Sequence, residues 1–334
     1  MKEFLLSFAI SFLIANSKKG LDLLTNEPQK FHEKPVPRIG GLSIFISTLY
    51  GFFVYKLLFN PLSLALSVSF LSGFIEDITR KISEKTRLLI LILAAFIAIF
   101  FANVLILNLN EVPILGELVK FLPIAVVFTT IAIVGLANAF NIIDGLNGLA
   151  SGTALIILAS IYFVALQNGD IEIKTLSEIL FTAILGFFVW NFPFGKIFLG
   201  DGGAYFIGFY IACLDILLNQ KHQQVSDWYA LAVIIYPVFE VIFSIIRRKF
   251  ILGLNPLKPD NFHLHSLLFQ LFMKKLSKSW ANPLAALIIL IAYSGYVYLV
   301  SIYWSDTPIL LLLIAIFCAV YTIFYFALYK KVRD

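Results

Sequence analysis

Long apolar stretches alternate with short polar connections along almost the whole chain. A membrane-spanning helix needs about 20 apolar residues, and stretches near this length recur eleven times. These candidate spans cover residues 4–24, 40–59, 62–75, 88–107, 121–140, 146–166, 176–190, 204–218, 228–246, 284–303 and 309–328. The third and seventh are the shortest. The pattern predicts an all-α polytopic membrane protein with about 11 transmembrane helices, forming a single domain over residues 1–334.

Composition supports this class and excludes others. The chain is 60% hydrophobic and 13% charged, whereas a soluble domain is about half apolar and a quarter charged. Its net charge of +5 resides mainly in the predicted inter-helix connections, so we expect an anionic membrane surface as the partner and no nucleic acid. Cys213 and Cys318 lie in apolar runs, which predicts neither a disulfide framework nor a cysteine metal site.

The distribution of basic residues predicts an orientation, because cytoplasmic loops carry an excess of Lys and Arg. If the connection after the first span is cytoplasmic, 20 of the 25 Lys and Arg residues fall on that side and 5 on the other. This places the N-terminus outside, the C-terminus in the cytoplasm and the protein in the cytoplasmic (inner) membrane. We expect five cytoplasmic segments to form an active site: 25–39, 77–87, 138–146, 191–203 and 247–280.

Carboxylates at the ends of apolar helices are the first candidates for chemistry, because charged groups beside lipid are costly. Glu76 and Asp77 end one apolar stretch, and adjacent carboxylates can bind a divalent cation or act as a base. The alternative is a solvated helix end paired with nearby Lys and Arg. Glu240 lies inside another apolar stretch, either as the structural partner of an arginine or with a direct role.

Two Asx–Gly segments carry the clearest signals. Asn141, Asp144 and Asn147 recur every three residues, so on a helix they share one face and suit a nucleobase, a ribose or hydrated Mg²⁺. Asp201 lies among the glycines of segment 199–203. Backbone N–H groups of such a segment can meet phosphate, and a carboxylate among phosphates implies Mg²⁺. The alternatives are a polar contact between helices and a helix cap.

The last cytoplasmic segment carries basic and imidazole groups. His263 and His265 are two residues apart without a third His or Cys nearby, so zinc binding is disfavoured. Beside phosphates they would act as cationic or hydrogen-bonding contacts; the alternative is a pair of surface histidines in a loop. Arg247 and Arg248 are further candidates for phosphate binding.

Taken in order, these motifs resemble the polyprenyl-phosphate N-acetylhexosamine-1-phosphate transferase family. The specific parts are NAFNIIDGLNGLASG at 138–152 and GKIFLGDGG at 195–203. HEKPVPRIGG at 32–41 and RRKFILGLNPLKPDNFHLH at 247–265 support them. The resemblance implies ten or eleven helices, a cytoplasmic active site, a Mg²⁺ requirement with Mn²⁺ as an alternative, and a homodimer.

The resemblance also implies roles for single residues. Asp77 matches the second residue of the family's Asp-Asp pair, and Glu76 replaces the first, so the catalytic carboxylates are expected to be Asp77, Glu76 and Asp201. The metal ligands are expected to be Asp201, Asn141 and Asp144. Many members have Asp at position 147, so Asn147 is expected to form hydrogen bonds. The substrate-binding set is Asn141, Asp144, Asn147, Asn191, Phe198, Lys34, Arg38, Arg247, Arg248, His263 and His265.

One departure from the family pattern separates its branches. His263 and His265 match a His-x-His-His motif, but Ser266 replaces its last histidine. The phospho-MurNAc-pentapeptide translocases have consecutive histidines there, so the glycan-initiating branch fits better.

The expected reaction is transfer of a sugar 1-phosphate from a UDP-N-acetylamino sugar to polyprenyl (undecaprenyl) phosphate, with release of UMP. It would be the first membrane step of O-antigen or cell-surface glycan synthesis. The alternatives are the peptidoglycan translocase and, in a different class, a membrane transporter or flippase. A transporter predicts polar residues on both faces, whereas these motifs gather on one.

Overall fold

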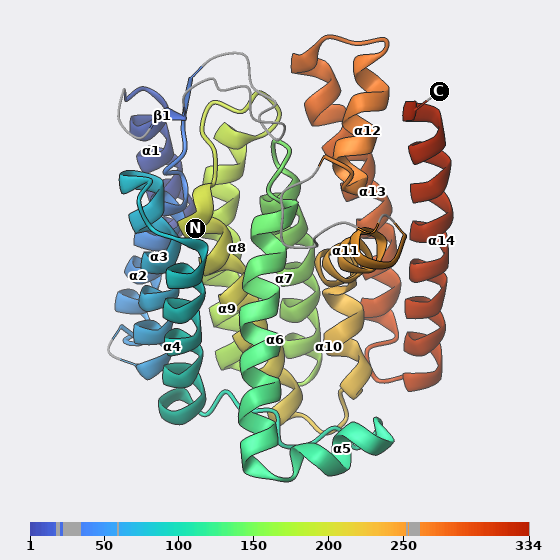
Figure 1. The fold of residues 1–334 in the computed structure, drawn as a ribbon. Helices are drawn as coiled ribbons and strands as arrows, with labels where there is room; N and C mark the ends of the chain where they lie inside the picture. Colours follow the sequence, from blue (N-terminus) through green and yellow to red (C-terminus); the bar gives the residue numbers. More distant parts are fainter. Residues whose placement is uncertain (18–20, 23–34, 59, 252, 254–260, 334) are drawn as a thin grey trace.

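The computed structural model describes residues 1–17, 21–22, 35–58, 60–251, 253 and 261–333. These residues form a bundle of long helices with one short antiparallel strand pair (Figure 1). The strands are β1 (Leu21–Asp22) and β2 (Val36–Pro37). The helices are α1 (Lys2–Ala15), α2 (Gly41–Val54), α3 (Pro61–Thr79), α4 (Glu84–Ala102), α5 (Pro113–Val119), α6 (Leu122–Ile143), α7 (Leu149–Gln167), α8 (Ile171–Asn191), α9 (Gly200–Lys221), α10 (Asp227–Val233), α11 (Ile235–Ile246), the π-helix η1 (Arg247–Ile251), α12 (Leu264–Met273), α13 (Lys278–Ile302) and α14 (Thr307–Arg333).

The prediction of a multi-pass all-α membrane protein is confirmed. In the described part of the chain, eight helices are long and apolar enough to cross a membrane, and the bent pair α10–α11 raises this number to nine. Each of the eleven predicted stretches contains a helix, but α1 and α2 have only 14 residues each. The count of 11 spans and the sides of the two termini therefore stay predictions.

The boundaries of several predicted stretches are wrong. The third and seventh, expected to be short, are the 19-residue α3 and the 21-residue α8. The first does not continue to residue 24, because α1 ends at Ala15. The short helices α5 and α12 were not predicted, since neither reaches the length of a span.

The ninth predicted stretch is not one straight helix. Its halves α10 and α11 meet at an angle of 74°. Pro237 lies in the first turn of α11, and a proline has no N–H to donate to the carbonyl four residues earlier. That carbonyl belongs to Val233, and the Tyr293 hydroxyl of α13 donates to it at 2.5 Å. The bend is thus stabilised by a side chain from another helix.

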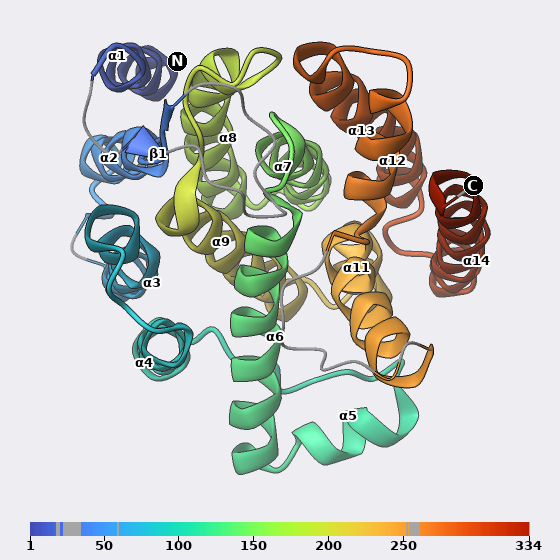
Figure 2. The same cartoon turned by 45° about the horizontal axis from the view of Figure 1, so that its top comes forward.

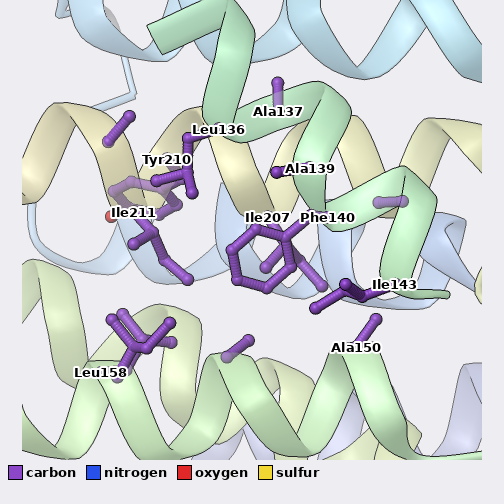
Figure 3. Packing of buried hydrophobic residues seen from close by; sticks show 14 of the residues in the cluster. Leu136, Ala137, Ala139, Phe140, Ile143, Ala150, Leu158, Ile207, Tyr210 and Ile211 are labelled. Atoms are coloured by element: carbon purple, nitrogen blue, oxygen red, sulfur yellow. The ribbon is translucent and has the colours of Figure 1, made fainter. Parts of the chain in front are cut away.

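Helix α9 lies at the centre of the bundle, surrounded by α3, α6, α7 and α8 (Figure 2). Of its most apolar 18-residue window, 94% is buried. Figure 3 shows Phe140 of α6 beside Ile207 of α9, and Ile143 of α6 close to Ala150 of α7. Apolar side chains give helices little preference for one another over lipid, so close packing holds such helices together. The core thereby fixes the position of the N-terminus of α9.

Candidate active site

The carboxylate of Asp77, in the last turns of α3, binds the beginning of α9. It accepts hydrogen bonds from the backbone N–H groups of Asp201 and Gly202, each at 2.9 Å. The first N–H groups of a helix have no partner inside it and attract negative charge. Asp77 therefore acts as an anionic cap that α3 supplies to α9.

Gly200 makes this junction possible. Its φ of +78° belongs to the left-handed region, which favours glycine. A Cβ atom there would also lie 2.3 Å from the carbonyl oxygen of Arg38 and 2.7 Å from Oδ2 of Asp77. Likewise, a Cβ atom at Gly73 on α3 would lie 2.4 Å from the carbonyl carbon of Asp201. Glycines on both helices thus let α3 and α9 approach closely enough for Asp77 and Asp201 to meet.

Two arginines converge on Asp201. Arg38 donates to its Oδ1 atom and Arg87 to its Oδ2 atom, and Nε of Arg38 lies 3.5 Å from Oδ1 of Asp77. Arg38 was predicted as a site residue, whereas Arg87 was not, although it lies in the predicted segment 77–87. Guanidinium groups match phosphates as well as carboxylates, so both arginines are suited to exchange Asp201 for a phosphate group.

Backbone hydrogen bonds hold Arg38 in place. The N–H of Phe198 donates to the carbonyl of Pro37 at 2.8 Å, and the carbonyl of Phe198 accepts from Gly40 at 2.9 Å. The chain on both sides of Arg38 is therefore attached to the loop before α9. The side chain of Phe198 is half-buried, and its predicted contact with the uridine stays a prediction.

Asp144, just after α6, lies near the same charges. Desolvation raises the pKa of Asp144 well above its usual range; the charge of Arg38 opposes this shift, and those of Asp201 and Asp77 add to it. Asn141, one turn earlier, donates to the Tyr205 hydroxyl of α9 at 3.4 Å. The structure thus gathers the three aspartates in one region, although their loops are far apart in sequence.

The two other asparagines that were predicted to bind substrate, Asn191 and Asn147, form hydrogen bonds with backbone groups. Oδ1 of Asn191 accepts from the N–H of Gly148 at 2.7 Å, and its Nδ2 donates to the carbonyl of Ile197 at 2.8 Å. Nδ2 of Asn147 donates to the carbonyl of Pro193 at 3.1 Å. Both side chains therefore tie the turn after α6 to the loop after α8. For Asn147 such a polar contact was the alternative to ligand binding, whereas for Asn191 it was not predicted. Their contact with substrate stays a prediction.

The neighbouring carboxylates Glu76 and Asp77 have different surroundings. Oε2 of Glu76 accepts from the N–H of Ile82 at 2.7 Å, in the connection between α3 and α4. Asp77 is buried against α9. Of the two, Asp77 is therefore the one that meets Asp201, while the contact of Glu76 serves the α3–α4 turn.

The histidine pair lies beside the Asp144 turn. A Cβ atom on Gly145 would be only 2.4 Å from Nε2 of His265, so the imidazole packs directly on that glycine. The rings of His263 and His265 are parallel within 3°, with centroids 5.5 Å apart. Nδ1 of His263 lies 3.0 Å from Oε1 of Glu240. Glu240 contacts His263 and Tyr321, so the predicted pairing with an arginine is not what these contacts favour.

The remaining predicted cations lie differently. Arg247 and Arg248 are buried, with 2% and 6% of their surfaces exposed. Nη1 of Arg247 donates to the Tyr325 hydroxyl of α14 at 3.0 Å, and its guanidinium lies over Phe262. Arg247 therefore fastens α11 to α14, and phosphate binding by either arginine stays a prediction. Lys34 lies outside the described residues.

The oxygen atoms of this site fit a metal ion whose remaining ligands come from the substrate. Over the residues described, no three or more His, Cys, Asp and Glu side chains are arranged to hold a metal ion. Mg²⁺ is commonly bound by one or two carboxylates together with phosphate oxygens and water. The carboxyl oxygens of Asp77, Asp144 and Asp201 near Arg38 suit such a shared site.

Comparison with known proteins shows to which family the chain belongs. Residues 59–219, which include all three aspartates and Arg87, match the profile of glycosyl transferase family 4. A protein of Thermotoga maritima named undecaprenyl-phosphate alpha-N-acetylglucosaminyl 1-phosphate transferase is 30% identical, over 88% of this chain and 86% of the relative. The chain belongs to glycosyl transferase family 4. This is the family of the polyprenyl-phosphate hexosamine-1-phosphate transferases, as the motifs predicted.

Two further family 4 relatives are matched over a shorter part of their length. A Bacillus subtilis protein named "Probable undecaprenyl-phosphate N-acetylglucosaminyl 1-phosphate transferase" is 34% identical over 71% of this chain. A decaprenyl-phosphate N-acetylglucosaminephosphotransferase of Mycolicibacterium smegmatis is 29% identical over 72% of it. The chain spans 66% of each of these two relatives.

Proposed function

We propose that this protein transfers the 1-phosphate of an N-acetylamino sugar from a UDP-sugar to polyprenyl (undecaprenyl) phosphate and releases UMP. The observation that carries the proposal is the Asp77–Asp201 junction at the start of α9, with Arg38 and Arg87 on its carboxylates. The names of the family 4 relatives describe the same kind of acceptor.

The arginines and carboxylates would divide the binding of the donor diphosphate. Arg38 and Arg87 would turn from Asp201 to the phosphate oxygens, for which their forked donors are suited. Asp201, with Asn141 and Asp144, would then hold Mg²⁺. When bound, Mg²⁺ neutralises phosphate charge and orients the reacting groups.

The acceptor phosphate would be positioned by Asp77. An oxygen of the acceptor phosphate would form the new P–O bond to the sugar-bearing phosphorus, while the bond from that phosphorus to the UMP oxygen breaks. A phosphate is already anionic near neutral pH, so charge neutralisation and alignment supply most of the rate. Asp77 lies close enough to Arg38 and Asp201 to orient the acceptor or take its remaining proton.

We further propose that the active end faces the cytoplasm, in the inner membrane, and that the enzyme is a homodimer of the glycan-initiating branch. The excess of Lys and Arg on this side supports the orientation, and Ser266 in place of a third histidine supports the branch. In the described residues, the connections after α3, α6 and α8 lie at one end of the bundle (Figure 1). Gathering of the polar motifs at one end favours an enzyme over a transporter.

UMP release tests the proposal. The purified protein in nanodiscs is mixed with undecaprenyl phosphate, Mg²⁺ and, in turn, UDP-N-acetylglucosamine, UDP-N-acetylgalactosamine and UDP-MurNAc-pentapeptide. We expect UMP with one of the first two sugars only, and none when EDTA is added. Turnover with the pentapeptide donor would establish the translocase instead. No UMP from any donor would overturn the transferase proposal in favour of a transporter.

A further inference from the structure

Arg87 lies over the ring of Tyr205, a residue to which the proposed reaction gives no role. Tyr205 is on α9 one turn after Asp201, so the two side chains lie on one face of the helix. Nη1 of Arg87 donates to Oδ2 of Asp201, and its Cζ atom lies 6.0 Å from the centroid of the Tyr205 ring. An aromatic face at this distance attracts a guanidinium. Arg87 therefore has two contacts on α9, one with a carboxylate and one with an aromatic ring.

The Tyr205 side chain is itself held by a neighbouring helix. It is buried, with 4% of its surface exposed. Its hydroxyl accepts a hydrogen bond at 3.4 Å from Nδ2 of Asn141, near the end of α6. Tyr205 thus contacts Arg87 of α4 through its ring and Asn141 of α6 through its hydroxyl. A buried ring attached at its far end gives the guanidinium a fixed surface on which to lie.

Arg87 has a donor group that the protein does not satisfy. Its Nε atom is buried and has no hydrogen-bond partner in the described part of the chain, and 13% of the side chain is exposed. A buried donor without an acceptor costs free energy, and a guanidinium carries five N–H donors in a fixed fork. A phosphate group offers several oxygens that match this fork. The unpartnered donor therefore indicates an anionic ligand beside Asp201.

The aromatic contact gains importance when Asp201 has another partner. In the proposed reaction Asp201 turns to Mg²⁺ and Arg87 turns to phosphate, so the ion pair between them is lost. The contact with Tyr205 uses no N–H donor of the guanidinium in a hydrogen bond, and all five donors remain available to phosphate. The ring can therefore hold Arg87 at the start of α9 while its donors change partner.

We propose that Tyr205 is a positioning residue whose ring holds the Arg87 guanidinium, so that this arginine binds a phosphate of the substrate when it leaves Asp201. That this phosphate belongs to a UDP-sugar rests on the proposed function. Asn141 contributes through its hydrogen bond to the Tyr205 hydroxyl. The expected effect of replacing the ring is therefore a lower affinity for a diphosphate.

Binding of inorganic pyrophosphate measures this affinity without turnover. The detergent-solubilised protein is titrated with pyrophosphate and Mg²⁺ in a calorimeter. We expect about fivefold weaker binding in Tyr205→Leu, the effect of one cation–π contact on an equilibrium, and at least tenfold weaker binding in Arg87→Gln. Tyr205→Phe keeps the ring and should bind within about twofold of the wild type. In the Arg87→Gln background, Tyr205→Leu should cause no further loss.

Tyr210 provides a matched control on the same helix. Its hydroxyl donates to the carbonyl of Leu176 at 3.2 Å, and its ring packs on Phe52 and Phe206. Tyr210→Leu should lower the melting temperature, because it removes a buried ring, and should leave the pyrophosphate affinity of the folded protein unchanged. If Tyr205→Leu does not fold, Tyr205→Met tests the same loss of the ring with a more flexible apolar side chain.

Turnover then connects the contact to the reaction. With the UDP-sugar that the wild type uses, Tyr205→Leu should raise KM about fivefold and keep kcat within about threefold. An interaction that forms before the chemical step and persists through it contributes to KM rather than to kcat. A ring that only supports the fold would instead reduce the fraction of active protein and leave KM unchanged.

Four results would overturn the inference. The first is a wild type that binds no pyrophosphate, and the second is wild-type affinity in the variants that lack the ring. The third is a loss in Tyr205→Phe as large as that in Tyr205→Leu, which would assign the effect to the hydroxyl. The fourth is a loss in Tyr205→Leu that persists undiminished in the Arg87→Gln background.

The inference and the proposed function fail in different ways. Pyrophosphate binding that depends on Tyr205 and Arg87, without UMP release from any donor, would retain the positioning role and reject the proposed reaction. UMP release by the wild type, together with an unchanged pyrophosphate affinity in Tyr205→Leu, would retain the reaction and reject the positioning role.

Discussion

At the scale of single residues, neighbouring side chains of similar chemistry have different tasks. Asp77 caps α9 and Glu76 closes a turn. Asn191 and Asn147 hold two loops together, although the spacing of Asn147 from Asp144 suggested a row of ligands. These residues differ in the group that each side chain contacts after folding. Side chains of the same type therefore have different roles.

Asp77→Asn and Asp201→Asn should each reduce UMP release at least a hundredfold while the protein stays folded. Each amide keeps the shape of the carboxylate but loses the charge that would orient phosphate or bind Mg²⁺. Initial rates and thermal unfolding in the same detergent check this. Glu76→Gln serves as the control and should retain most of the activity, because the amide oxygen can still accept from Ile82. Near-normal turnover of either Asp variant would contradict its assigned role.

Asn191→Ala should destabilise the site strongly, although it removes only a small side chain. It would leave the N–H of Gly148 and the carbonyl of Ile197 without their present partner, and each buried unsatisfied group costs about 1–3 kcal/mol. We expect a lower melting temperature and slower UMP release. Asn16→Ala, whose amide contacts only the carbonyl of Phe12, should change neither. Equal melting temperatures for both variants would rule out the framework role of Asn191.

At the scale of elements, two helix termini are assembled with groups from other helices. The start of α9 receives Asp77 from α3, and the start of α12 receives Glu240 from α11. The first turn of each of these helices is therefore stabilised by a carboxylate from another helix. The end of α9 is similarly attached to the α7–α8 connection, where Nε2 of His222 lies 2.9 Å from Asp170.

Gly200→Ala should reduce UMP release at least tenfold and lower the melting temperature. The left-handed backbone alone costs a residue with a Cβ about 1–2 kcal/mol, and this Cβ would also press on Asp77 and the Arg38 carbonyl. Gly135→Ala on α6 is a matched control, because a Cβ there meets nothing within 4 Å. Activity of the Gly200 variant equal to that of the control would contradict the packing described for this junction.

The attachment of α9 to the α7–α8 connection should weaken in acid. Burial acts to raise the pKa of Asp170, but hydrogen bonds from Ile173 and His222 and the charge of Lys221 outweigh it and lower that pKa. A carboxyl whose pKa is lowered on folding stabilises the fold above its unfolded value, and this stabilisation is lost as pH falls through the folded value.

The melting temperature of the wild type should therefore fall more steeply below about pH 4 than that of Asp170→Asn. Glu172→Gln, which removes an exposed partner of Lys221, should keep the wild-type slope. Parallel curves for the wild type and Asp170→Asn would show that this carboxyl contributes nothing to the pH dependence of stability.

At the scale of the whole molecule, the bundle separates chemistry from support. Asp77, Asp144 and Asp201 gather with Arg38 and Arg87 around the start of α9, whereas the other ends of the helices carry a different polar cluster. There Glu111 accepts from the hydroxyls of Ser226 and Thr307 at 2.6 and 2.5 Å and from the N–H of Asp227 at 3.0 Å. It fastens the segment before α5 to the starts of α10 and α14.

Glu111→Ala should accordingly lower the melting temperature by several degrees and leave kcat for UMP release within about twofold at a temperature where the variant is folded. Three donors lose their acceptor, at about 1 kcal/mol for each hydrogen bond. Glu117→Ala, which loses only an exposed pair with Lys120, provides the comparison. A large fall in kcat without unfolding would place this distant cluster in the reaction.

The pattern of apolar and polar positions by itself determined a multi-pass helical protein and located its chemical groups, because burial in lipid requires long apolar helices and makes charged exceptions conspicuous. It did not give the bend between α10 and α11, where a hydroxyl from α13 binds the Val233 carbonyl. It missed Arg87, which lies in the first turn of α4, because a basic residue beside a predicted span resembles any other cation of a connecting segment.

Only the tertiary structure decided which groups meet. It brought Asp77 rather than Glu76 to Asp201, placed two arginines on that carboxylate, and gave Glu240 a histidine instead of an arginine. The contacts of Asp201 join residues more than a hundred positions apart. The contact of Glu240 depends on α11, which follows the bend after α10. Local sequence fixes which helix carries a side chain, whereas the packing of several helices fixes the partner that the side chain meets.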